Sequence, residues 1–316
     1  MKSIRQENDR LGFVGIGYMG RPIARRLIEY GFKLTAYDRD HNKAEQLIRY
    51  GGTVAQSISE LSSSCNVVLS CLPSDEAVLD TYSGSDGVFA HVHPGSVVID
   101  MSTVYPETSQ ELSKRGSQRG VEVLDVTISG STPTAENGLL TLFGGGNKER
   151  FESAESIFRV IAKNYFYLGP SGSGAIMKLV VNALLGIGMQ AIAEAVALGE
   201  KAGLDRNRLL DVLSQTAVVA PAHAGKLQRA KKSDYSPQFP IRLMNKDFGL
   251  IFNLAAAVGA RMPAAGAAYE INARQTDEGE EQDFSAVILQ MEKLAHLGSK
   301  NVGLTRVGAD SASKVI

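Results

Sequence analysis

The residues with the clearest chemical potential are a lysine and an asparagine within a long apolar stretch. Gly174, Lys178 and Asn182 follow one another at intervals of four, which places them on one side of a helix. The other positions between 176 and 181 are apolar, so the lysine ammonium would be shielded from water. Burial lowers the pKa of a lysine and makes it a candidate acid or base near neutral pH, with Asn182 orienting the substrate or the amine. The alternative is an ordinary solvated surface lysine.

A glycine-rich turn near the start of the chain indicates a binding site. Segment 15–20 has the pattern G-x-G-x-x-G, with an apolar strand-like run before it and a helical stretch from Met19 to Tyr30 after it. Gly15 would permit the tight turn, Gly17 would let the backbone approach a pyrophosphate, and Gly20 would let the helix pack closely on the strand. The N–H groups at the helix start favour phosphates, so the predicted ligand is a dinucleotide. A purely structural glycine turn is the alternative.

Two residues at the end of the second predicted strand bear on which dinucleotide binds. Asp38 lies about twenty residues beyond the turn, where a carboxylate accepts hydrogen bonds from both ribose hydroxyls of NAD and repels a 2′-phosphate. Arg39 could instead pair with that phosphate or stack on the adenine. The two signals conflict, and we expect NAD or NADP with NAD favoured.

Two polar turns follow later strands. Ser129, Gly130 and Ser131 end the strand-like run VEVLDV with N–H and hydroxyl groups that could hold a carboxylate. Ser102 and Thr103 end another strand, where they would cap the next helix, face a ligand, or do both. The carboxyl ends of parallel strands are where ligands bind in such sheets, so both turns are candidate site residues.

The elements that must position these residues fall into two predicted domains. A chain of 316 residues exceeds what one hydrophobic core usually supports. Up to residue 170 strands alternate with helices, which predicts an α/β domain with a doubly wound parallel sheet covered on both faces. Beyond 170 only helical runs are evident. We therefore expect a polar leader over 1–10, a dinucleotide-binding domain over 11–170, an all-α domain over 171–298 and a mobile tail over 299–316.

The charge and composition of the chain exclude some classes of binding partner. The net charge is −1 and no basic stripe is evident, which argues against nucleic acid. No apolar run is both long enough and sufficiently free of polar residues to cross a membrane. The polar N-terminus does not resemble a secretory signal. Two cysteines, Cys65 and Cys71, fit a reducing cytosol better than a disulfide framework. The long helix predicted over 174–202 is so apolar that we expect it to be covered, either between the two domains or between subunits of a homodimer or homotetramer.

Taken in this order, the motifs resemble the β-hydroxyacid dehydrogenase family over nearly all of Leu11 to Leu297, and several separate motifs agree. The family includes 3-hydroxyisobutyrate dehydrogenase, tartronate semialdehyde (2-hydroxy-3-oxopropionate) reductase and glyoxylate/succinic semialdehyde reductase. The resemblance implies Lys178 as the catalytic residue. It implies a substrate site that comprises Ser129, Gly130, Ser131, Asn182, Phe239 and Asp247. It implies a cofactor site that comprises Gly15, Gly17, Tyr18, Met19, Gly20, Asp38, Arg39, Leu72, Pro73, Thr103 and Lys246. No metal is implied.

This sequence departs from the family pattern at the substrate turn. Ser131 stands where many members have a second glycine, as in the glyoxylate/succinic semialdehyde branch. Thr132 and Thr134 have no evident role. Asp38-Arg39-Asp40 also differs from the asparagine-arginine-serine/threonine sequence that members using NADP often show.

The resemblance implies a reversible hydride transfer between NAD(P) and a small β-hydroxyacid or semialdehyde acid, with Lys178 as general acid or base. Three alternatives differ in class. An imine reductase that uses NADPH generally lacks the lysine, and a 6-phosphogluconate dehydrogenase needs a longer helical part. A non-catalytic NAD(P)-binding oligomerisation scaffold would not require Lys178 or Asn182.

Overall fold

The computed structural model describes residues 3–274 and 279–297. These residues form two compact units, and two helices contribute to both. The first unit comprises Met1–Leu184 and Leu243–Met262, and the second comprises Leu185–Arg242 and Pro263–Ile316. The tail predicted to be mobile, 299–316, lies outside the described residues.

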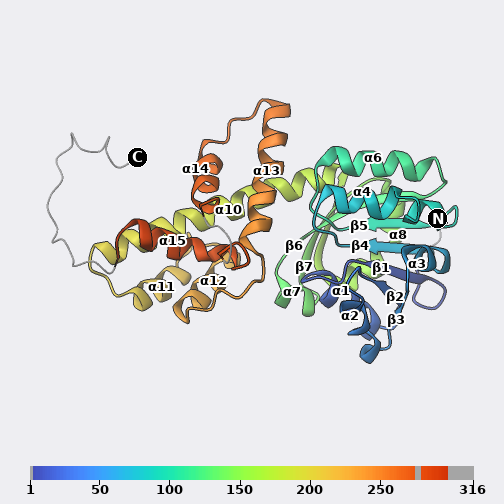
Figure 1. The fold of residues 1–316 in the computed structure, drawn as a ribbon, viewed down its shortest axis with the longest axis horizontal. Coiled ribbons are helices and arrows are strands. Elements are labelled where there is room, and N and C mark those ends of the chain that lie inside the picture. Colours follow the sequence, from blue (N-terminus) through green and yellow to red (C-terminus); the bar gives the residue numbers. More distant parts are fainter. Residues whose placement is uncertain (1–2, 275–278, 298–316) are drawn as a thin grey trace. The chain divides into compact units, whose positions relative to one another are not determined.

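The first unit is built on an eight-stranded sheet with the order β3-β2-β1-β4-β5-β6-β7-β8 (Figure 1). Strands β1 to β6 pair in parallel, whereas β7 runs antiparallel to β6 and parallel to β8. The strands are β1 (Arg10–Val14), β2 (Lys33–Tyr37), β3 (Thr53–Val54), β4 (Val67–Ser70), β5 (Val97–Asp100), β6 (Glu122–Ser129), β7 (Leu140–Gly145) and β8 (Ala162–Gly169). The expected parallel sheet is thus confirmed through β6. Only a short segment with one helical turn joins β6 to β7, and a parallel return needs a longer crossover.

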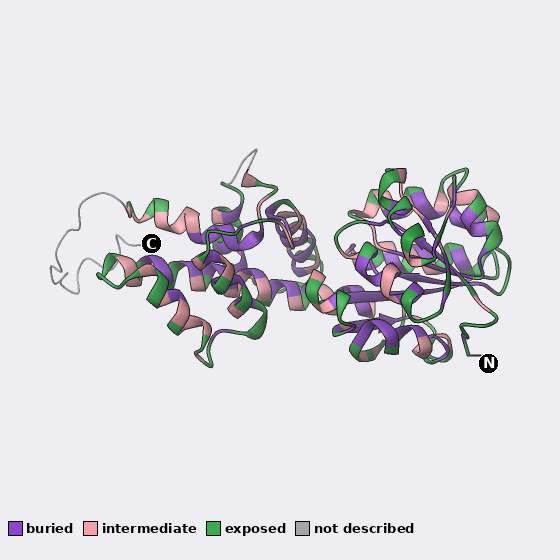
Figure 2. Cartoon of the chain, turned by 90° about the horizontal axis from the view of Figure 1, so that it is seen from below, coloured by how far each residue is buried: buried purple, intermediate pink, exposed green. Residues whose placement is uncertain are grey.

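Helices cover both faces of this sheet, which explains why the side chains of β4 and β5 are buried at every position and mostly apolar. In β4, Val67 and Leu69 belong to one buried cluster and Val68 to the other, because successive side chains point to opposite faces. Figure 2 shows the strands of this sheet largely in the buried colour. The first cluster includes side chains from α1 (Gly20–Glu29), α8 (Lys148–Ser153) and α9 (Glu155–Ile161). The second includes side chains from α3 (Ile58–Ser64), α4 (Asp75–Ser83), α5 (Val88–His91) and α6 (Pro106–Ser117).

The short elements of the first unit lie in its connections. They are α2 (His41–Glu45), the 3₁₀ helix η1 (Ile48–Tyr50) and α7 (Thr132–Glu136). Helix α7 follows the serine-glycine-serine turn and contacts α1, the helix that begins at the glycine-rich turn. This contact joins the two turns that the sequence singled out.

The rest of the described chain is helical, as predicted. The helices are α10 (Ser173–Lys201), α11 (Arg206–Ser214), α12 (Pro221–Lys231), α13 (Ile241–Val258), α14 (Pro263–Asn272), the 3₁₀ helix η3 (Phe284–Ala286) and α15 (Val287–Leu294). The Asp205 side chain accepts a hydrogen bond from the Arg208 N–H at 2.9 Å and so caps α11. Beyond β8, extended pairing within the described residues is confined to one isolated bridge, Pro240 with Asp283.

The expectation that no segment could span a membrane was wrong by the criteria of length and composition. Helix α10 has 29 residues and a mean hydropathy of 1.7 over its most apolar window. The polar residues of this helix are scattered, and few of them are charged. The core helix of a soluble protein meets the same criteria of length and composition.

The core of the first unit gives a prediction about stability. Phe158 in α9 is fully buried, with its ring centroid 4.8 Å from that of Phe151 and 5.8 Å from that of Tyr165. We expect Phe158→Ala to lower the free energy of unfolding by about 3–5 kcal/mol, because it removes a buried ring and leaves a cavity. Phe166→Ala is the matched control, since that ring is 50% exposed, and should cost far less. Urea unfolding measures both, and equal losses would contradict this account of the core.

Candidate active site

The glycine-rich turn joins β1 to α1, and its three glycines meet different surroundings. Gly15 has a φ of 92°, and a Cβ there would lie 2.4 Å from the Cys71 carbonyl oxygen. A Cβ on Gly20 would lie 1.9 Å from the Gly15 carbonyl oxygen, so only glycine lets α1 begin this close to the strand. A Cβ on Gly17 would meet no atom within 4 Å. The backbone at Gly17 is therefore open on the side where a side chain would stand, as a site for a pyrophosphate requires.

Asp38 follows β2 and supports this turn directly. Its Oδ2 accepts a hydrogen bond from the Ile16 N–H at 2.7 Å, and its Oδ1 accepts one from the Asp40 N–H at 2.9 Å. The carboxylate thus lies within hydrogen-bond reach of the turn and remains partly accessible. Arg39 is exposed. The predicted contact of Asp38 with the ribose of a dinucleotide stays a prediction.

The ends of β4 and β5 meet at the same edge of the sheet. Ser70 pairs with Asp100 in the parallel register, and Val14, directly before the glycine-rich turn, pairs with Ser70. The Leu72 N–H donates to Ser102 Oγ at 2.9 Å, which ties the Leu72-Pro73 turn to the Ser102-Thr103 turn. The expectation that Ser102 or Thr103 caps the following helix was wrong. Helix α6 begins at Pro106 with Tyr105 as its N-cap residue and without a side-chain cap, so both Ser102 and Thr103 lie before the cap position. The Ser102 hydroxyl is bonded to Asp100 at 2.6 Å.

Lys178 and Asn182 lie near a second pair of predicted site residues, Lys246 and Asp247 of α13. The Asn182 amide donates to Asp247 Oδ2 at 2.5 Å, and Lys246 Nζ lies 2.9 Å from Asp247 Oδ1. Lys246 Nζ also donates to the Thr103 carbonyl oxygen at 2.6 Å. Asn182 and Asp247 are almost fully buried, and Asn182 Oδ1 has no hydrogen-bond partner in the described structure. An unsatisfied buried acceptor of this kind is available to a donor on a ligand.

The pKa of Lys178 is lowered from 10.5 to about 8. Burial of its ammonium group is the largest cause; Asp247 raises the pKa, Lys246 lowers it, and Cys71 raises it. The residue surface is still partly accessible, so a small molecule can reach it. The sequence predicted a shielded amine with a lowered pKa, and the structure has one.

The predicted substrate turn has well-defined local geometry. Gly130 has a φ of 146°, and a Cβ there would lie 2.5 Å from Thr134 Oγ1. The Ser131 N–H donates to Thr134 Oγ1 at 2.6 Å in a capping box at the start of α7. Thr132 Oγ1 donates to the Tyr18 carbonyl oxygen at 3.4 Å and so links this turn to the glycine-rich turn. The two threonines without an evident role in the sequence therefore shape the turn and attach it.

Phe239 belongs to the second unit, and its surroundings there are specific. Its N–H donates to Asp283 Oδ2 at 3.1 Å, and its ring lies edge-on to Phe284 with centroids 5.8 Å apart. Asp283 is fully buried and is paired with Lys226 at 2.6 Å. The predicted contact of Phe239 with substrate stays a prediction.

Sequence reasoning gave no role to two buried carboxylates, Asp100 and Asp125. Asp125 Oδ1 accepts from the Gly172 N–H at 2.9 Å and Oδ2 from the Ala175 N–H at 3.1 Å, so it holds the start of α10, the helix that carries Lys178. Burial raises the pKa of Asp125 to about 6, although the hydrogen bonds from Gly172 and Ala175 lower it. The available signal was one acidic residue near the end of each of two apolar strands, SVVIDM and VEVLDV.

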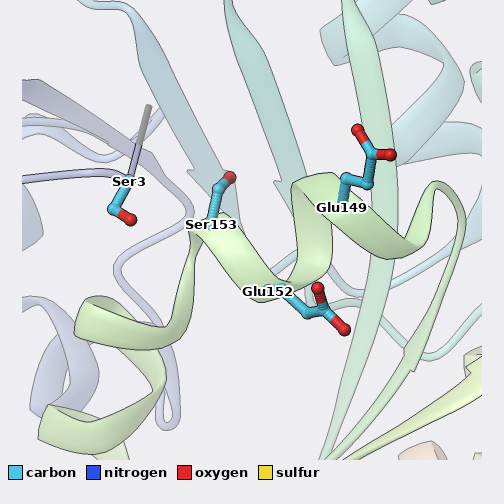
Figure 3. A pocket seen from close by; sticks show the side chains of 4 residues that line it. All are labelled: Ser3, Glu149, Glu152 and Ser153. Carbon is cyan, nitrogen blue, oxygen red and sulfur yellow. The ribbon is translucent and has the colours of Figure 1, made fainter. Parts of the chain in front are cut away.

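A pocket of about 250 Å³ lies elsewhere on the first unit (Figure 3). It is lined by Ser3, Glu149, Glu152 and Ser153, and the Ile4 N–H beside it donates to the Ser153 carbonyl oxygen at 2.9 Å. Ile4 precedes β1, whereas the glycine-rich turn follows that strand. The pocket contains none of the predicted site residues and is acidic, which does not suit an anionic ligand.

Two family models match the chain. Residues 10–169 match the NAD binding domain of 6-phosphogluconate dehydrogenase, and residues 172–291 match the NAD-binding domain of NADP-dependent 3-hydroxyisobutyrate dehydrogenase. Together they cover both the glycine-rich turn and the helix with Lys178.

Individual relatives match over almost the whole chain. Glyoxylate/succinic semialdehyde reductase 1 of Arabidopsis thaliana is 36% identical over 88% of this chain and 96% of its own length. The NAD-dependent L-serine dehydrogenase of Pseudomonas aeruginosa is 32% identical over 88% of this chain and 96% of its own length. The structure of Mycobacterium tuberculosis 3-hydroxyisobutyrate dehydrogenase with L-serine is 29% identical, covers 90% of this chain and 99% of that one, and has a TM-score of 0.78. The chain therefore belongs to the β-hydroxyacid dehydrogenase family of NAD(P)-dependent oxidoreductases.

Proposed function

We propose that this protein interconverts a small semialdehyde acid and the corresponding hydroxyacid, with Lys178 as the general acid or base. The observation that carries this proposal is the Lys178 amine, whose pKa lies near 8 beside Asp247, Lys246 and Asn182 in the same unit as the glycine-rich turn. A group that exchanges protons near neutral pH is what a carbonyl reduction needs at the oxygen atom.

The residues of the turn fit a dinucleotide. Gly15, Gly17, Tyr18, Met19 and Gly20 would hold the pyrophosphate at the start of α1, and Asp38 with Arg39 would meet the adenosine ribose. Leu72, Pro73, Thr103 and Lys246 would lie along the nicotinamide half. When bound, the cofactor supplies or accepts the hydride at its nicotinamide ring.

The chain's own groups would manage the substrate and the proton. In reduction, as hydride reaches the carbonyl carbon, the Lys178 ammonium gives a proton to the carbonyl oxygen and becomes a neutral amine. In oxidation the neutral amine removes the hydroxyl proton. Ser129, Gly130 and Ser131 would hold the substrate carboxylate, with Asn182, Asp247 and Phe239 completing the site. Fixing the carboxylate decides which carbon faces the hydride.

Within this class we favour a glyoxylate or succinic semialdehyde reductase with NADH as the reductant. Ser131 in the substrate turn supports that substrate class, and the relative from Arabidopsis bears this name. Asp38 beside the Ile16 N–H supports NAD, because its carboxylate would repel a 2′-phosphate. Arg39 favours NADP, as a partner for that phosphate.

We further propose that the protein assembles with itself and acts in the cytosol. Ile176, Val180 and Leu184 recur every four residues along α10 and are 41%, 50% and 69% exposed in the single chain. An exposed apolar stripe on a helix favours association, which would give a homodimer or homotetramer. Light scattering of the purified chain measures its mass in solution. We propose no nucleic-acid or membrane partner.

The proposed function is tested by steady-state assays of the wild-type protein. NADH and NADPH are each tried with glyoxylate, succinic semialdehyde, tartronate semialdehyde and methylmalonate semialdehyde. We expect turnover of the first or second aldehyde with a higher kcat/KM for NADH. Activity with cyclic imines but not with these aldehydes would support the imine reductase alternative. Cofactor binding without any turnover would support the scaffold alternative.

The role of Lys178 is tested by Lys178→Ala. We expect kcat to fall by a factor of roughly 10²–10⁴, the usual worth of a positioned acid or base, while NADH binding persists. Lys201→Ala is the matched control, because Lys201 lies in the last turn of the same helix and is exposed. Near-normal turnover of the Lys178 variant would remove this residue from the mechanism.

The pKa of Lys178 gives the sign of the pH dependence. Because the ammonium is the proton donor in reduction, kcat for reduction should fall as pH rises through about 8, and kcat for oxidation should rise over the same range. Asp247 raises this pKa, so Asp247→Asn should move both limbs to lower pH. Rate profiles between pH 6 and pH 10 measure the limbs. Limbs that stay in place in the Asp247 variant would show that another group titrates.

A further inference from the structure

A chain of buried hydrogen bonds runs beneath the ends of β4 and β5. Asp100, the last residue of β5, is 2% exposed. Its Oδ1 accepts from Ser70 Oγ and from Ser102 Oγ, each at 2.6 Å, and lies 3.3 Å from the Ser102 backbone nitrogen, which also donates to it. Tyr82 OH donates to Ser70 Oγ at 2.6 Å. One carboxylate oxygen therefore gathers the donors of two neighbouring strand ends.

The Ser102 hydroxyl connects Asp100 to the Leu72-Pro73 turn. Because Ser102 Oγ donates its proton to Asp100, its lone pairs face the Leu72 N–H, which donates to it at 2.9 Å. Without Asp100 the hydroxyl could rotate, and the Leu72 N–H would lose its oriented acceptor. The spacing between the Leu72-Pro73 turn and the Ser102-Thr103 turn thus depends on a carboxylate that is almost fully buried.

The same turn also bears on Lys246. The Thr103 carbonyl oxygen, one residue beyond Ser102, accepts from Lys246 Nζ at 2.6 Å, and Lys246 Nζ lies 2.9 Å from Asp247 Oδ1. A shift of the Ser102-Thr103 turn would therefore move the oxygen that places Lys246. Tyr82 in α4 forms the other end of this chain of hydrogen bonds. It is bonded to Ser70, and this bond reaches neither turn.

We infer that Asp100 is a positioning residue, whose buried carboxylate holds the two strand-end turns at the spacing that the nicotinamide half of the cofactor requires. This inference rests on the proposed function, because that function places the nicotinamide beside these turns. The adenosine half would lie on the glycine-rich turn and Asp38. The loss of Asp100 should therefore affect one half of the cofactor and not the other.

The test compares the binding of NADH with the binding of ADP-ribose, which lacks the nicotinamide. Dissociation constants are measured by calorimetry on the full-length protein. For Asp100→Ala we expect NADH to bind about tenfold more weakly, the worth of a hydrogen bond to a charged group, and ADP-ribose to bind within about twofold of wild type. Asp100→Asn keeps an acceptor oxygen at the Oδ1 position and should restore most of the NADH affinity.

Tyr82→Phe is the matched control. It removes a hydroxyl from the same buried chain but from the end that reaches neither turn, so both ligands should bind as they do to wild type. A general loss of structure would weaken NADH and ADP-ribose together, and that result for Asp100→Ala would overturn the inference. Unchanged binding of both ligands would also overturn it.

An unfolded Asp100 variant and a wild-type protein that binds no cofactor are different outcomes. If Asp100→Ala shows no cooperative thermal unfolding, Ser102→Ala replaces it, because that change removes the hydroxyl's bonds to Asp100 and to the Leu72 N–H with the loss of one atom. For this variant too we expect NADH to bind about tenfold more weakly and ADP-ribose to bind as it does to wild type. The absence of this difference refutes the inference. If the wild-type protein binds neither NADH nor NADPH, the proposed function fails, whatever the variants do.

Discussion

The candidate active site depends on how its surroundings balance the charged and neutral forms of the Lys178 amine. Burial disfavours the ammonium form of Lys178, the Asp247 carboxylate favours it, and the neighbouring Lys246 disfavours it again. A lysine in water would remain charged at neutral pH and would be a poor base. A fully buried and unpaired lysine would lose its proton too readily to serve as an acid. With a pKa of about 8, both protonation states of Lys178 are within reach, and a reversible proton transfer requires both.

The surrounding structure keeps the members of this balance in place. Asp247 is fixed by the Asn182 amide from one helix and by Lys246 on its own helix. Lys246 is fixed in turn by the Thr103 carbonyl oxygen at the end of the β5 region. Asp125 holds the first turn of the helix that carries Lys178 and Asn182. The position of the amine therefore follows from contacts to the segment after β5 and to β6, and not from its own helix alone.

Much of this could be predicted from the sequence, because some signals are local. The roles of Gly15 and Gly20 follow from backbone conformation and close approach, and the structure has both. The four-residue spacing of Lys178 and Asn182 is also a local property of a helix. The alternating strands and helices predicted the sheet and the helical remainder, and the family resemblance was confirmed.

Other features depend on contacts between distant residues, and the sequence does not specify these. Nothing local indicates that Asn182 donates to Asp247, 65 positions away, or that the Leu72 N–H, 30 positions away, donates to Ser102. The reversed direction of β7 arises from a short connection whose length alone did not reveal it. Thr132 was left without a role because its partner, Tyr18, lies 114 positions away. The bond between Ser131 and Thr134 spans only three residues, so the capping box was a local signal that sequence reasoning missed.

The central claim is that Lys178 titrates near neutral pH within the folded protein. Nuclear magnetic resonance of protein labelled with ¹³C at the lysine Cε atoms measures this directly, with the Lys178 signal assigned by its absence from Lys178→Ala. The balance described above predicts a midpoint near pH 8. A midpoint near 10.5, the ordinary value for a lysine in water, would show that the amine is not held in the predicted environment and would contradict the account.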